Sequence, residues 1–215
     1  MTNREPVNIM GGFAFPNPDK DKRDIRFIDS EYHTLFTIKD GESIVITRFD
    51  GEKMVFPCKY IDDCHVCIGN SAYHICEFAE MQERSGNTYV PRTPKISAEI
   101  GTYEIYQIPA TADVDYYFRP YAEAKGKLQN ADYQRSYAGM FAKENSLEHL
   151  WAKHNSDHRP FARRMHSMSV SDVVVLTQAG KKTAYYADTI GFKEVPEFLA
   201  QQRVQKKHKE RGEAR

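Results

Sequence analysis

The sequence predicts an α+β protein of two modules: an antiparallel β-meander with one helix, then a mixed sheet with several helices that ends in a β-hairpin and a basic C-terminal helix. Three observations lead to this fold class. Short β-branched runs are separated by Asp40-Gly41 and Asp50-Gly51, and Asp-Gly is a strong hairpin signal because both central turn residues need a positive φ. Apolar residues recur at helical spacing over residues 72–79. A polar segment with Pro91 and Pro94 then divides the chain.

The first module is expected to begin after a flexible N-terminal arm. Residues 1–30 are polar and contain Pro16, Pro18 and a charged run, which is typical of such an arm. A small α+β domain is predicted over residues 31–86. Its strands are expected at residues 34–38, 43–49 and 53–56, with a fourth within 60–68. A helix is expected from Asn70 or Ser71 to about Arg84, because Gly86 follows as a stop signal.

The second module follows a linker that we place at residues 87–100. It is predicted over residues 101–199, and a basic tail over residues 200–215 completes the chain. We expect a strand at 102–108, helices from Arg119-Pro120, at 130–141 and at 146–154, strands at 170–176 and 183–188, and a last helix from Pro196. Ser146 is the expected cap of its helix, and Gly180 lies in the turn of the final hairpin.

The charges of the chain balance overall but not locally. Thirty basic and thirty acidic residues cancel. Residues 1–100 carry 12 basic and 16 acidic side chains, whereas residues 201–215 carry 6 and 2, so an acidic front opposes a basic tail. The start of the sequence has no signal-peptide pattern, no apolar run approaches the length of a membrane span, and four cysteines are too few for a disulfide scaffold. We therefore expect a cytoplasmic protein with free thiols and no membrane contact.

Cysteine and histidine residues gather within a short segment of the first module. Cys64 and Cys67 have the spacing at which two thiolates reach one zinc ion, and His74 with Cys76 would complete four ligands. The second pair is expected on a helix at i and i+2, where side chains point to different faces. Small buried thiols are therefore the preferred interpretation, and we expect no metal or other cofactor. Asp62, Asp63 and His65 form a neighbouring set that would suit acid–base chemistry or a divalent cation, or else a turn.

The stretch from His166 to Phe198 carries a more specific pattern. It reads HSMSVSDVVVLTQAGKKTAYYADTIGFKEVPEF, with a Ser-rich start of a strand, a glycine turn, a Tyr-Tyr-x-Asp strand and a Gly-Phe element. The matching positions are Ser167, Ser169, Val170, Ser171, Asp172, Val173, Tyr185, Tyr186, Asp188, Gly191 and Phe192. This pattern resembles the YodL-like domain family over about residues 102–199. The chain departs from the family at Ala187, where valine is more common, and at Thr189-Ile190, where Ser-Phe is common.

Residues 31–86 are similar to a small domain associated with large polyvalent proteins of phages and conjugative elements. The similarity rests on Leu35–Gly41, on Asp62-Asp63-x-His65 and on residues 73–80 (YHICEFAE). Together the two resemblances imply an accessory factor of a bacterial mobile element. Neither family implies a catalytic activity.

The serines and the aspartate of the motif are expected to be structural. Ser169 and Ser171 would lie on one face of a strand and Asp172 on the other, so a catalytic set with His166 is not expected. Short polar side chains ahead of a strand more often bond local backbone groups. Asp188 and Gly191 are interpreted in the same way, as a turn after the last strand, and Phe192 as part of the same structural motif. No catalytic residue is predicted.

Partner contacts are expected in two basic segments, 153–166 and the tail, and at one of the two adjacent tyrosines. The candidates are Arg159, Arg163, Arg164, His166, Tyr186, Lys206 and Lys207. The leading hypothesis is a non-enzymatic interaction or regulatory protein of a mobile element or phage that modulates a host process by binding a host protein. One alternative is an anti-defence protein, similar to an anti-CRISPR, that engages a guide RNA or ribonucleoprotein through the basic segments. Another is a metal-dependent enzyme that uses the Cys/His segment.

Overall fold

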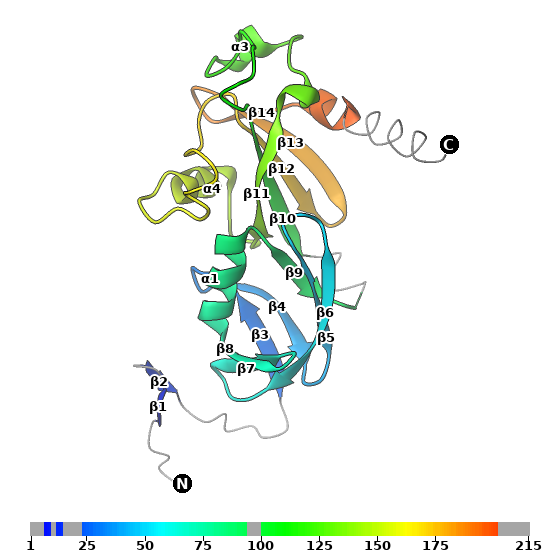
Figure 1. Cartoon of the computed structure of the whole chain (residues 1–215), viewed down its shortest axis with the longest axis vertical. Coiled ribbons are helices and arrows are strands. Elements are labelled where there is room, and N and C mark those ends of the chain that lie inside the picture. The colour runs from blue at the N-terminus through cyan, green and yellow to red at the C-terminus, as the bar shows by residue number, and fades with distance from the viewer. Residues whose placement is uncertain (1–6, 10–11, 15–22, 94–99, 202–215) are drawn as a thin grey trace, which may run out of the picture. The chain divides into compact units, whose positions relative to one another are not determined.

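A computed structural model describes residues 7–9, 12–14, 23–93 and 100–201 of the chain (Figure 1). The chain divides into two compact units, Met1–Ile100 and Gly101–Arg215. Both units combine antiparallel strands with a few helices, so the predicted α+β class is confirmed. No helix in the described part of the chain is long and apolar enough to cross a membrane.

The described residues of the first unit form three antiparallel sheets and one helix. A short pair is formed by β1 (Val7–Ile9) and β2 (Gly12–Ala14), and a second pair by β3 (Asp24–Ile28) and β4 (Thr34–Lys39). The five-stranded sheet has the order β8-β7-β6-β5-β9. Its strands are β5 (Ser43–Thr47), β6 (Lys53–Tyr60), β7 (His65–Ile68), β8 (Ser71–His74) and β9 (Thr88–Pro91). Helix α1 (Ile75–Ser85) packs against β3, β8 and β9.

The predicted hairpin around Asp50-Gly51 is present, but the predicted three-stranded meander is wrong in one pairing. Strands β5 and β6 pair across the turn at Gly51, where φ is +93°. Strand β4 pairs instead with β3, in which Ile25 lies opposite Ile38. The pairing partner of β4 therefore comes from the segment that we expected to be a flexible arm.

The arm boundary needs correction for this reason. Phe27 is fully buried, and its ring stacks on Phe36 with centroids 4.7 Å apart and meets Phe78 of α1 edge-on. Aromatic rings in such geometries contribute strongly to a core. Residues 24–28 are thus a core strand, whereas residues 1–6, 10–11 and 15–22 of the expected arm lie outside the described residues.

Two further boundaries of the first unit differ from prediction. Strand β9 pairs with β5 inside the expected linker 87–100, and Tyr89 of this strand is buried in the core. Helix α1 begins at Ile75, later than expected, because residues 71–74 form β8 and the imidazole of His74 caps the helix by accepting a bond from the Cys76 N–H. The helix ends at Gly86 as predicted, with φ +66° at that residue.

The described part of the second unit is one antiparallel sheet with helices on both sides. The strand order is β11-β10-β12-β13-β14. The strands are β10 (Gly101–Gln107), β11 (Gln134–Phe141), β12 (Val173–Gln178), β13 (Lys181–Ala187) and β14 (Phe192–Glu194). The helical elements are α3 (Tyr121–Ala124), the 3-10 turn η1 (Asn130–Asp132), α4 (Leu147–His154) and residues 196–201.

One predicted helix of this unit is wrong, and two other elements are as predicted. Residues 134–141 form β11, which pairs with β10 along its whole length, although we expected a helix over 130–141. Helix α4 is present with the Ser146 hydroxyl accepting from the His149 N–H. The final hairpin of β12 and β13 turns around Gly180, where φ is +76°.

Both faces of this sheet are covered by core residues. Val173, Val175 and Tyr186 belong to one core, which includes Phe198. Val174 and Leu176 belong to the other, which includes Leu150 of α4. The two-residue alternation of β12 thus divides its side chains between two cores, and the strand reads as a continuous apolar run.

Candidate functional site

The residues of the sequence motif meet at one end of the sheet of the second unit. Strand β10 ends there at Gln107, β12 begins there at Val173, and β13 ends there at Ala187, opposite Phe192 of β14. The segments 108–133, 155–172 and 188–191 therefore leave or enter the sheet at this end, which also carries α3 (Figure 1). We call these segments the motif end.

A tight turn precedes β12 and uses the serines and the aspartate of the motif. The Asp172 Oδ2 accepts a bond of 2.9 Å from the Ser169 N–H, and the Asp172 N–H donates to the Ser169 carbonyl. Ser171 has φ +80°, and its hydroxyl accepts from the N–H of Phe118. Residues 169–172 are thus a turn, and the expectation that they continue the strand with opposed faces is wrong.

The Asp172 carboxylate is fully buried beneath this turn. Its Oδ2 also accepts a bond of 2.8 Å from the Gln107 side-chain amide, whereas its Oδ1 has no hydrogen-bond partner among the described residues and lies 3.9 Å from His166 Nε2. Burial raises the pKa of Asp172 to about 7, against the opposing effects of Gln107, His166 and the Ser169 N–H. The turn therefore holds a carboxyl group that titrates near neutral pH.

No serine of the motif is hydrogen-bonded to His166 by its hydroxyl in the described part of the chain. The Ser169 hydroxyl donates to the Ser167 carbonyl, and the Ser171 hydroxyl is occupied by Phe118. The His166 Nδ1 lies 2.7 Å from the Ser167 carbonyl oxygen. A nucleophile needs a base within hydrogen-bond reach, and here these hydroxyls contact backbone groups instead.

A second turn, at residues 188–191, has the same local character. The Asp188 Oδ1 accepts from the backbone N–H groups of Thr189 and Tyr121, and the Asp188 N–H donates to the Gly191 carbonyl. Gly191 has φ +69°, a conformation that glycine adopts without strain. The turn presents Ile190, which is 88% exposed.

A second exposed side chain at this end is that of Phe118. This residue has φ +58° and is 53% exposed, and its ring stacks on Tyr117 with centroids 3.8 Å apart. Its ring also lies edge-on to His166 at 6.2 Å. The sequence carried no signal for this conformation, because Phe is not a residue type that favours positive φ.

Tyr186 is a core residue, so the expectation of a partner contact there is wrong. Its side chain is fully buried, and its hydroxyl donates a bond of 2.8 Å to the Arg119 carbonyl. The adjacent Tyr185 points to the other core and is partly buried. The period of two along a strand places the two rings on opposite faces of the sheet, as expected, and Tyr186 is the fully buried one.

The basic candidates fall into exposed and half-buried positions. Arg163 and Arg164 are exposed, and the Arg164 guanidinium lies 5.3 Å from the centre of the Phe161 ring. Arg159 is half-buried, and its Nε has no hydrogen-bond partner among the described residues. Lys206 and Lys207 lie outside the described residues.

The cysteine and histidine candidates do not form a metal-ligand group in the described part of the first unit. His74 caps α1, and the Cys67 thiol is directed to the Gly69 carbonyl at 3.5 Å. Cys64 and Cys76 are partly buried free thiols. Among the described residues, the one group of three or more potential ligands consists instead of Asp29, Glu31 and His33.

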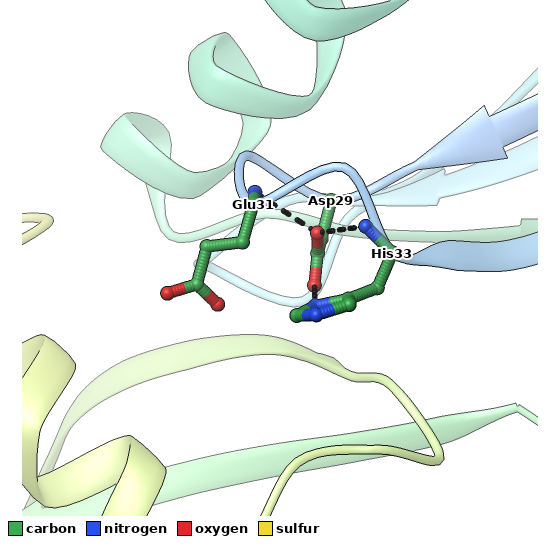
Figure 2. Close-up of side chains that lie close together, drawn as sticks. All are labelled: Asp29, Glu31 and His33. Carbon is green, nitrogen blue, oxygen red and sulfur yellow. Dashed lines mark hydrogen bonds and ion pairs between the residues drawn. The ribbon is translucent and has the colours of Figure 1, made fainter.

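The Asp29 group lies in the turn between β3 and β4 (Figure 2). The Asp29 Oδ1 accepts from the N–H groups of Glu31 and His33, and its Oδ2 lies 3.1 Å from the His33 Nδ1. Both carboxylate oxygens of this buried residue thus hold the turn together. The group was not expected, because Asp29 lies in the polar segment that was assigned to the flexible arm. The available signal was the aspartate two residues before Glu31, which is typical of an Asx turn.

Asp62, Asp63 and His65 do come together, in a cavity of about 310 Å³ of the first unit. The described residues that line it are Asp24, Ile25, Arg26, Tyr60, Asp62, Asp63, His65 and Ile75. Asp62 accepts from the N–H groups of Cys64 and His65 and from the His65 ring at 2.8 Å. Partial burial raises the pKa of Asp62, but these hydrogen bonds together hold it below its ordinary value. Asp62 thus both stabilises a turn and lines the cavity.

Comparison with known proteins identifies the second unit. The family model of the YodL-like domain matches residues 102–198. Searches of curated proteins and of solved structures gave no match. The match confirms the resemblance found over residues 102–199 and coincides with the sheet and motif end described above. Residues 102–198, which lie within the C-terminal unit, therefore form a YodL-like domain.

Proposed function

We propose that the protein is a non-enzymatic interaction protein that binds a host protein through the motif end of its YodL-like domain. In this proposal it is a regulatory factor of a bacterial mobile genetic element or phage and modulates a host process. One observation carries the proposal: a hydrogen-bonded turn of the motif anchors the backbone of Phe118 and another carries Ile190, and both side chains are exposed.

The polar residues of the motif hold the backbone of the loops at the motif end by hydrogen bonds, and this arrangement supports the proposal of a binding surface. Ser171 anchors the N–H of Phe118, and Asp188 anchors both its own turn and the N–H of Tyr121. A loop that is already held in its bound conformation loses less conformational entropy on association. Large apolar side chains on such loops are typical anchors of a protein interface. The motif would then be a support for contact residues.

A pull-down from a bacterial host tests this proposal. Full-length protein and the double variant Phe118→Ser/Ile190→Ser are compared, each with and without ribonuclease treatment. A matched control is Val55→Ser, which removes an exposed apolar side chain of the first unit. We expect a defined host protein to be retained by the wild type and the control in both conditions, and to be lost from the double variant. Retention by the double variant would contradict the proposal.

A second candidate function is supported by the exposed arginines of the basic segment 153–166. Arg163 and Arg164 lie on the surface of the YodL-like domain, and no ion pair holds either of them within the described part of the chain. This arrangement suits a contact with RNA phosphates, as in an anti-defence protein that engages a guide RNA or ribonucleoprotein. Each phosphate contact adds about 0.7 to the salt dependence of single-strand binding.

RNA binding measured against salt concentration tests this second function. If both arginines contact phosphates, Arg163→Ala/Arg164→Ala lowers the slope of log K against log salt by about 1.4. Lys181→Ala/Lys182→Ala, which changes two exposed lysines of β13, serves as the control. An unchanged slope in the arginine variant, or no binding at low salt, would refute the RNA contact.

A further inference from the structure

A cavity of about 220 Å³ lies beside the Asp188 turn of the YodL-like domain. It is lined by Glu148, Trp151, Asp188, Thr189, Gly191 and Phe192. Three of these residues, Asp188, Gly191 and Phe192, belong to the family motif, and Glu148 and Trp151 come from α4. The two α4 residues are three positions apart and so project from the same side of the helix.

The walls of the cavity combine aromatic rings with carboxylates. The rings of Trp151 and Phe192 are 6.3 Å apart between centroids, at an interplanar angle of 80°, so they form two nearly perpendicular walls. Glu148 and Asp188 supply two carboxylates, and none of the six lining residues is basic. A cation is attracted both by the face of an aromatic ring and by a carboxylate.

The rim of the cavity offers an apolar contact. Ile190 stands between two lining residues, Thr189 and Gly191, and is the most exposed of the large apolar side chains in the described part of the chain. Its backbone is fixed by the hydrogen bonds of Asp188. A partner that fills the cavity would therefore cover Ile190 with the residue next to the one inserted.

We propose that this cavity receives an arginine side chain of the partner protein, with an apolar neighbour of that arginine packed on Ile190. The inference rests on the proposed function and names the chemistry of the partner. The planar guanidinium group can stack on Trp151 or Phe192 while its N–H groups reach Glu148 and Asp188. An ammonium group is a strongly hydrated point charge and matches such walls less well.

Trp151 makes the proposal directly measurable because it is the one tryptophan of the whole sequence. The full-length protein is titrated with the peptide acetyl-Gly-Leu-Arg-Leu-Gly-amide while tryptophan fluorescence is recorded. The matched probe replaces arginine by citrulline, which has the same shape but no charge. The variants are Glu148→Gln, which removes one wall carboxylate, and Ile190→Ser. The control is Glu144→Gln, an exposed glutamate outside the cavity.

We expect a saturable change with the arginine peptide and at least about 3-fold weaker binding of the citrulline peptide. Glu148→Gln is expected to weaken arginine binding by about 3-fold, the effect of one partly exposed charge pair, and Glu144→Gln to leave it unchanged. Equal binding of arginine and citrulline peptides, or of a lysine peptide and the arginine peptide, would overturn the assignment. So would the absence of a saturable change.

The result separates the two proposals. If the pull-down succeeds and depends on Phe118 and Ile190 while the peptide does not bind, the arginine cavity is wrong and the interaction function stands. If the peptide binds as expected and no host protein is retained, the cavity stands and the proposed host interaction fails.

Discussion

Replacing Asp172 by asparagine should make the YodL-like domain more stable at alkaline pH, although it removes a charged residue of the family motif. Both hydrogen bonds to the carboxylate, from Gln107 and from the Ser169 N–H, reach the same oxygen, Oδ2. The amide oxygen of asparagine can occupy that position and accept both bonds. The amide nitrogen then takes the place of Oδ1, near His166 Nε2.

The magnitude follows from the raised pKa of about 7, whose main cause is burial. Below about pH 4 the carboxyl group is protonated in both the folded and the unfolded chain, so it causes no loss of stability. Between about pH 4 and 7 the unfolded chain releases the proton and the folded chain keeps it, so the free energy of unfolding falls as the pH rises. The loss is complete above about pH 7 and amounts to about 4 kcal/mol.

Asparagine does not titrate, so the variant lacks this loss. The difference in the free energy of unfolding between Asp172→Asn and wild type is expected to shift by about 2–3 kcal/mol in favour of the variant from pH 5 to pH 8. Burying an amide nitrogen with an imperfect partner costs about 1–3 kcal/mol at every pH. The variant is therefore expected to be comparable or weaker at pH 5 and the more stable protein at pH 8.

Urea unfolding followed by tryptophan fluorescence measures this difference, because Trp151 reports on the same unit. At each pH, the free energy of unfolding of the variant is compared with that of the wild type. Burial lowers the pKa of His154 to about 3, an effect that by itself makes stability fall as the pH drops below about 6.5 and so opposes that of Asp172. His154 is common to both proteins and cancels. A difference that stays constant from pH 5 to pH 8 would refute the buried titration of Asp172.

Three further changes test the packing of the YodL-like domain. Ser146→Ala removes the hydroxyl that caps α4 and should lower the free energy of unfolding by about 1 kcal/mol in urea titrations, with Ser146→Asn as the conservative control. Gly139→Ala places a Cβ 2.7 Å from the Tyr137 ring and 2.9 Å from the Tyr103 ring, so thermal unfolding should show a loss of about 1–3 kcal/mol; an unchanged melting temperature would contradict this close approach. His154→Gln removes the buried imidazole that bonds the Tyr103 hydroxyl, so the variant should gain stability relative to the wild type as the pH falls below about 6.5.

Local signals account for the parts of the fold that the sequence predicted. The turn at Gly51, the Ser146 cap and the hairpin at Gly180 each depend on residues within a few positions of one another. Their turn and cap chemistry is readable because a positive φ or an N-terminal cap restricts the residue types that fit. These elements therefore need no knowledge of the rest of the chain.

The missed elements depend on partners that are distant in sequence. Strand β3 lies in a polar segment, and what makes it a core strand is the contact of Phe27 with Phe78 and Tyr89. Strand β9 follows Gly86 and contains a proline, yet it pairs with β5 more than forty residues earlier. Strand β11 is buried along almost its whole length, so it shows no alternation that would distinguish it from a buried helix.

The contrast between local signals and contacts of residues distant in sequence also explains how much of the candidate site could be predicted. The motif identified Asp172, Asp188 and Gly191, because short polar residues and glycine have specific uses in turns. The motif did not reveal the exposed neighbours of these turns. The backbone of Phe118 is held by the Ser171 hydroxyl, 53 positions away, and the ring of Trp151 in α4 packs edge-on against Phe192. A family pattern made of turn residues therefore locates the proposed binding surface without containing most of its proposed contact residues. For this domain, the informative substitutions are those of the exposed neighbours of the motif, because changing the motif itself would alter binding and folding together.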